Sequence, residues 1–149
     1  MVTAVDARIS SPRPAFDAAR LARLAAPLAA VLAGFAGQYA DFRSLREPIL
    51  LVVGLGVLAT GWAFTREAGA WRTILLAAAI GTATWGGAQL VYVILHVLSG
   101  EPFEMERIDP QWAQAITLVA AHAAFLGVPT GLVAGLLLAG RRTVTGRLS

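Results

Sequence analysis

The chain has no cysteine and no lysine, and charged residues make up only 14% of its 149 positions. The absence of cysteine excludes disulfides, thiolate nucleophiles and cysteine-ligated metals. Average soluble domains carry about 25% charged residues, so the shortage of charge is large. A water-soluble fold of this length would bury too little surface to hide so much apolar chain. The composition therefore indicates one compact membrane domain.

Charge is absent altogether from four long segments. They lie between Arg23 and Asp41, Pro48 and Arg66, Arg72 and Glu101, and Trp112 and Arg141. A helix needs roughly 17–25 apolar residues to cross a bilayer core, and each segment approaches or exceeds that length. The sequence predicts an all-α fold, a polytopic bundle of four transmembrane helices with spans at about 20–39, 48–65, 72–98 and 112–139. The lipid bilayer is therefore an expected partner.

The arginines indicate how the bundle is oriented. Nine flank the spans on the side that holds both termini: Arg8, Arg13, Arg20, Arg23, Arg66, Arg72, Arg141, Arg142 and Arg147. The other side holds three, Arg43, Arg46 and Arg107. Since short cytoplasmic loops collect arginine, we predict cytoplasmic termini in a multi-pass protein of a prokaryotic cytoplasmic membrane. The arginines form no interleaved basic and aromatic patch, so no nucleic-acid partner is expected.

The ends of the chain are polar. We expect residues 1–17 to be a disordered cytoplasmic tail, residues 18–140 to form the transmembrane domain, and residues 141–149 to be a basic cytoplasmic tail. A cleaved signal peptide is the alternative interpretation of the first span, because Arg20 and Arg23 precede a short apolar run. Against it, the region before that run is unusually long and no clean A-x-A cleavage site follows.

Helix-breaking residues predict the shape of the later spans. Pro48 is expected in the first turn of the second span, where its missing N–H is no loss. Pro129 is expected to kink the fourth span, because its ring displaces a backbone hydrogen bond. Gly140 is expected to end that span before Arg141.

Small residues repeat at steps of three and four, which lets helix backbones approach closely in lipid. The predicted packing face of the fourth span consists of Ala120, Ala124, Gly127, Gly131 and Gly135. The first span carries a similar series, Ala26, Ala30, Ala33 and Gly37. Packing within one bundle accounts for both series, and a face for a homo-oligomer is the open alternative.

The third span carries a polar stripe. Its members follow steps of three and four and fall within an arc of about 80°: Thr82, Trp85, Gln89, Tyr92 and His96. His122 and Gln89 lie at similar distances from the ends of their spans, so we predict that they are neighbours, with Tyr92 and Trp85 on either side. Polar groups in hydrocarbon face the bundle interior or a wet cavity. We therefore take Trp85, Gln89, Tyr92 and His122 as a candidate ligand-binding cluster, with plain interhelical hydrogen bonding as the alternative.

Metal or haem binding would depend on His96 and His122. Their depths differ by about 10 Å from the helical rise, which argues against a shared iron, and His96 is expected to face water. The acidic segment 101–109 lacks the spacing and the turn glycine of a calcium loop, so a solvated loop is expected there. No metal site and no cofactor are expected.

No catalytic motif appears, and no acid or arginine lies within a span. The chain is therefore not expected to be an enzyme. The function we expect is that of an accessory or stabilising subunit, which acts through helix–helix contacts with a membrane complex. A binder or carrier of a small or apolar molecule, held between the third and fourth spans, is the alternative. A haem-binding redox subunit is a third.

Overall fold

The computed structural model describes residues 17–40, 42–100 and 111–145, without the side chains of residues 42–44 and 142–145. The described chain is all α-helical. Its elements are α1 (Ala18–Tyr39), α2 (Phe42–Thr65), α3 (Ala70–Ser99), α4 (Gln111–His122), the π-helical turn η1 (Ala123–Gly127) and α5 (Val128–Thr145). The last three are consecutive and form one rod. Residues 1–16 of the predicted tail, the acidic loop and residues 146–149 lie outside the described residues.

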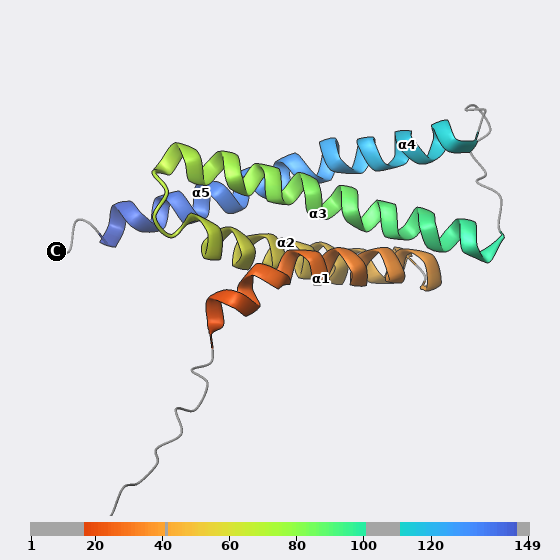
Figure 1. Ribbon diagram of the computed structural model, residues 1–149, viewed down its shortest axis with the longest axis horizontal. Coiled ribbons are helices and arrows are strands. Elements are labelled where there is room, and N and C mark those ends of the chain that lie inside the picture. Colours follow the sequence, from red (N-terminus) through yellow and green to blue (C-terminus); the bar gives the residue numbers. More distant parts are fainter. Residues whose placement is uncertain (1–16, 41, 101–110, 146–149) are drawn as a thin grey trace, which may run out of the picture.

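The four rods run up and down along one axis, as Figure 1 shows. The start of α1, the turn from α2 to α3 and the end of α5 lie at one end, here called the terminal end. The end of α1, the start of α2, the end of α3 and the start of α4 lie at the opposite end, the hairpin end. Four helices are long and apolar enough to cross a membrane, so the prediction of an all-α chain with four candidate spans is confirmed. The central helix is α3, which contacts every other element.

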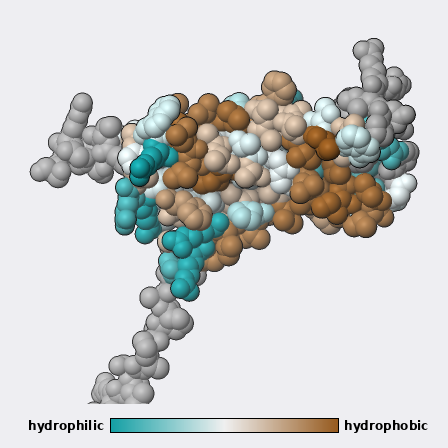
Figure 2. All heavy atoms as spheres, turned by 45° about the horizontal axis from the view of Figure 1, so that its top comes forward, coloured by the Kyte–Doolittle hydropathy of each residue, from teal (hydrophilic) through white to brown (hydrophobic). Residues whose placement is uncertain are grey.

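The surface suits lipid better than water. Large apolar side chains point outward from every rod, among them Leu51, Leu98 and Phe125, which is 79% exposed. Figure 2 shows apolar surface along the bundle, with hydrophilic residues gathered near the terminal end. The interior is built from small residues and from Val53 and Val57, which are fully buried. Since lipid removes the hydrophobic drive to associate, close packing has to hold the helices together.

The contact between α1 and α2 includes hydrogen bonds to the backbone of α1 beside Pro27. Pro27 lies inside α1, and Figure 1 shows the first turns of this helix inclined to the rest. Directly before this proline, the N–H of Ala26 donates a hydrogen bond to the hydroxyl of Thr60 in α2. The same hydroxyl donates to the carbonyl of Ala22, and both bonds are 2.9 Å long. In an uninterrupted α-helix these two backbone groups bond each other. The α2 side chain is therefore inserted into the hydrogen-bond ladder of α1, a known cause of helix bending.

Two predicted helix boundaries are wrong. Pro48 does not open its helix, because α2 begins at Phe42 and includes Pro48. Gly140 does not end its helix, because α5 continues to Thr145. A glycine ends a helix by taking a left-handed conformation. Among the described glycines only Gly100 has a positive φ, and it caps α3.

The predicted kink at Pro129 takes the form of the π-helical turn η1, directly before the proline. Proline removes the N–H that would bond the carbonyl four residues earlier. The N–H of Val128 reaches back five residues to the carbonyl of Ala123. Such a wide turn accommodates one extra residue and rotates the helix faces on its two sides. The faces of α4 and α5 are therefore out of register.

This rotation divides the predicted packing face of the fourth span. A Cβ at Gly127 would lie 2.6 Å from the Cα of Thr82, and one at Gly135 would lie 2.7 Å from the Cα of Ile74. Gly131 approaches the α3 backbone equally closely. Ala120 in α4 and Ala124 in η1 are exposed. These two alanines therefore do not pack inside the bundle among the described residues.

Candidate functional site

Trp85 fills the centre of the bundle. Its side chain is 4% exposed and belongs to the same buried cluster as Val53 and Val57 of α2. Its indole N–H donates a 3.2 Å hydrogen bond to the hydroxyl of Thr130. That hydroxyl in turn donates to the carbonyl of Leu126. A buried indole N–H needs such an acceptor, so Trp85 has a structural explanation within the chain.

Tyr92 and His96 lie on the α1 side of α3, near the hairpin end. Their rings stack with centroids 5.6 Å apart. The Nδ1 of His96 lies 3.3 Å from the Oε1 of Gln38 in α1. Because an amide oxygen can only accept, Nδ1 carries the proton. Gln38 also donates to Ser99, whose hydroxyl donates to the carbonyl of His96.

The expectation that His96 faces water is wrong, since this residue is only 9% exposed. Residue spacing alone provides no reason to connect His96 with Gln38. One feature of the sequence nevertheless points to a helical position for Gln38 near α3. Gln38 lies one residue beyond Gly37, the last member of the small-residue series on the first span, and Tyr92 packs against Gly37.

His122 hydrogen-bonds within its own helix. Its Nδ1 lies 2.9 Å from the carbonyl oxygen of Leu118, so Nδ1 is the protonated nitrogen and Nε2 carries an acceptor lone pair. Over residues 17–40, 42–100 and 111–145, no hydrogen-bond partner is recorded for that Nε2 or for the side chain of Gln89. Both side chains are partly exposed.

The structure places Gln89 within about one helical turn of the level of His122. A Cβ on Gly86 would lie 3.4 Å from that of Ala123 and 4.0 Å from Val119, so Gly86 faces the α4 turn that contains His122. Gln89 is on the next turn of α3. Each is about 15 Å from the hairpin end of its helix by the rise per residue. That is about halfway through a hydrocarbon core of about 30 Å.

The two side chains also point to the same side. At about 100° per residue, Gln89 is rotated about 60° from the direction of Gly86, and His122 is rotated similarly from Val119. In antiparallel helices these rotations turn both groups to one side of the α3–α4 contact. It is the side on which Trp85 meets α2. Similar depth and a shared direction support the prediction that Gln89 and His122 are neighbours, which itself stays a prediction.

On this side α4 stands apart from the bundle. In the described chain α4 contacts α3 and η1 but neither α1 nor α2, whereas α5 contacts α2 as well as α3. The change occurs at η1, where the rod bends. We call the pair Gln89 and His122 the mid-membrane polar site.

The histidines are not arranged as a haem pair. The imidazole of His96 is held toward α1 by Gln38, while His122 is on α4, which does not contact α1 among the described residues. Within those residues there is also no group of three or more metal-ligating side chains. The acidic segment 101–109, expected to be a solvated loop, lies outside the described residues.

The fold defines a class of protein, an all-helical chain with four helices able to span a membrane. No protein-family model, no curated protein and no solved structure matches the chain in comparisons with known proteins.

Proposed function

We propose that the terminal end faces the cytoplasm of a prokaryotic cell and that the protein spans its cytoplasmic membrane. The support is the distribution of arginine. Arg20, Arg23, Arg66, Arg72 and Arg141 all lie near the terminal end. Arginine concentrates in short cytoplasmic segments.

We further propose that the protein is an accessory or stabilising subunit, which binds another membrane protein, or a second copy of itself, through the mid-membrane polar site. The observation that carries this proposal is the pair Gln89 and His122. These side chains hold a free amide and a free acceptor nitrogen at mid-membrane depth, among the residues described. A polar group left without a partner in hydrocarbon is costly, and such groups face a protein neighbour or a wet cavity.

The helix arrangement supports a protein partner. α4 packs on one helix only, so a helix of another chain can lie beside it and reach both polar groups. Ala120 and Ala124 are not part of this surface, because at about 100° per residue they point away from His122. A small or apolar molecule at the same two groups is the second candidate, favoured by the same free amide and acceptor nitrogen. The haem alternative has no support, because the two histidines lie in separate surroundings.

The test is extraction of tagged protein from its native membrane in mild detergent, followed by native electrophoresis and identification of co-purifying proteins. We expect a complex larger than the single chain. The double variant Gln89→Leu/His122→Leu should reduce its yield about tenfold, because each polar interhelical contact is worth about 0.6–2 kcal/mol and 1.4 kcal/mol is a factor of ten.

Thr117→Val is the matched control on the same helix. Thr117 is exposed, and its hydroxyl donates to the carbonyl of Ala113 in its own helix, so this variant should leave the complex intact. Thermal unfolding of each purified variant checks that the fold survives. Migration of the wild-type chain alone, or an unchanged complex in the double variant, contradicts the subunit proposal. A co-purifying small molecule that the double variant loses would favour the ligand alternative instead.

A further inference from the structure

A groove of about 500 Å³ lies between α2 and α5 toward the terminal end. Its walls are almost wholly apolar. They are formed by Leu55, Leu58, Ala59, Trp62, Leu137, Leu138 and Arg141. The α2 members recur at steps of three and four and therefore share one face of that helix. The volume is within the range of about 300–1,000 Å³ typical of ligand sites.

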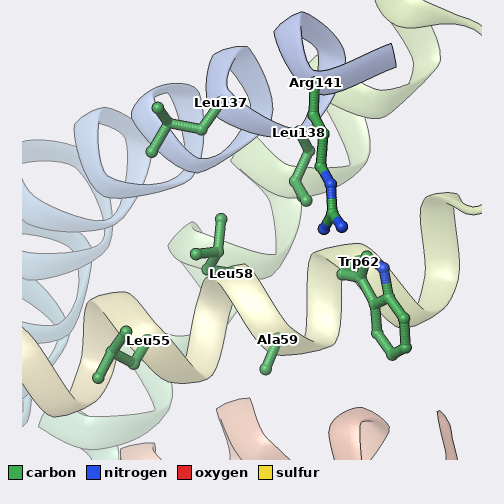
Figure 3. A pocket seen from close by; sticks show the side chains of 7 residues that line it. All are labelled: Leu55, Leu58, Ala59, Trp62, Leu137, Leu138 and Arg141. Atoms are coloured by element: carbon green, nitrogen blue, oxygen red, sulfur yellow. The ribbon is translucent and has the colours of Figure 1, made fainter. Parts of the chain in front are cut away.

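The groove has a cation at one end. In Figure 3, Arg141 extends from α5 toward α2, with its guanidinium beside Leu138 and facing Trp62. The guanidinium of Arg66 also lies over the ring of Trp62, 4.0 Å from the ring centroid. None of the described residues that line the groove is acidic. One end of the groove is therefore positively charged, and the remainder is suited to hydrocarbon.

The position of the groove selects the kind of molecule that can occupy it. Leu55 is seven residues, or about 10 Å of helix, deeper along α2 than Trp62, and both Trp62 and Arg141 lie near the helix ends where headgroups are found. Tryptophan prefers that level of a membrane. A molecule that fits must be apolar inside the bilayer and anionic at its surface.

We propose that this groove binds an anionic phospholipid, with its phosphate on the guanidinium of Arg141 and an acyl chain along the leucines. Arginine binds phosphate oxygens through paired N–H groups, and basic pockets between transmembrane helices recognise anionic headgroups. The proposal requires that the chain spans a membrane but does not require the subunit function. The groove is formed by α2 and α5, whereas the mid-membrane polar site is on α3 and α4.

The test measures binding to the full-length protein, purified in detergent and stripped of lipid. Phosphatidylglycerol and phosphatidylcholine with the same acyl chains are titrated separately, and the shift in melting temperature is followed. We expect a saturable stabilisation by phosphatidylglycerol that phosphatidylcholine does not match. Arg141→Gln should weaken phosphatidylglycerol binding about tenfold, and Ala59→Phe, which fills the groove, should weaken it while leaving the arginine in place.

Arg72→Gln is the control, because Arg72 is an exposed arginine at the terminal end that does not line the groove. It should bind phosphatidylglycerol like the wild type. Equal effects of the two lipids, or equal losses in Arg141→Gln and Arg72→Gln, would overturn the proposal. It would also be overturned by full binding in Ala59→Phe, or by inorganic phosphate that stabilises the protein as much as the lipid does. Circular dichroism before titration confirms that each variant is folded.

Discussion

The hydroxyl of Thr60 joins α2 to the backbone of α1 by two hydrogen bonds. It bonds both Ala22 and Ala26 at the point where Pro27 interrupts α1. Thr60→Val keeps the shape of the side chain but leaves a backbone N–H and a carbonyl without this partner. Since an unsatisfied buried polar group costs about 1–3 kcal/mol, we expect a loss of about 1–2 kcal/mol in the free energy of unfolding, measured in detergent.

Thr60→Ser should recover most of that stability, because serine keeps the hydroxyl. If valine and serine destabilise the protein to the same extent, packing rather than hydrogen bonding explains the role of Thr60.

At the scale of elements, the tightest contact is that of α3 with α5. Gly131→Ala would direct a methyl group into the backbone of Ala77 and Ala78. Overpacking of this kind costs about 1–3 kcal/mol, so we expect a lower melting temperature in detergent.

The same substitution at another glycine provides the comparison. Gly54 has no atom within 4 Å of an added Cβ. Gly54→Ala should therefore leave stability unchanged or raise it by about 0.5–1 kcal/mol, because alanine favours helix over glycine. If both variants behaved alike, close approach of α3 and α5 would not be what stabilises the bundle.

The turn η1 gives the fourth rod two parts with different surroundings. On the terminal side, α5 packs against α3 through Gly131 and Gly135 and also contacts α2. On the hairpin side, α4 contacts one long helix in the described chain. The proposed lipid groove and the mid-membrane polar site follow from this division, since each depends on where the fourth rod lies relative to α2.

For the whole molecule, the testable property is its orientation. Green fluorescent protein fused after Ser149 should fluoresce, because it folds on the cytoplasmic side, and alkaline phosphatase fused there should be inactive. Inserted into the segment 101–110, the two reporters should give the opposite result. An active phosphatase after Ser149 would mean that the arginines do not set the orientation.

The sequence by itself determined that the chain is helical and has four candidate spans, because charge-free length and helical periodicity are local properties. It also identified the polar stripe on α3, whose members share a face through the helical repeat alone. Helix ends were less predictable. Pro48 and Gly140 are compatible with helix interiors, and nothing in their immediate neighbours excludes a boundary there.

Only the tertiary structure decided which partners these faces meet. Trp85 points to Thr130 and His96 to Gln38, two partners on different helices, although both residues belong to one stripe. The reason is that α3 is central, and different helices cover different lengths of the same face. The π-helical turn likewise leaves Ala120 and Ala124 exposed, whereas the glycines that continue their spacing meet α3. Contacts between distant segments depend on the bend of a rod, and residue spacing along the chain does not encode that bend.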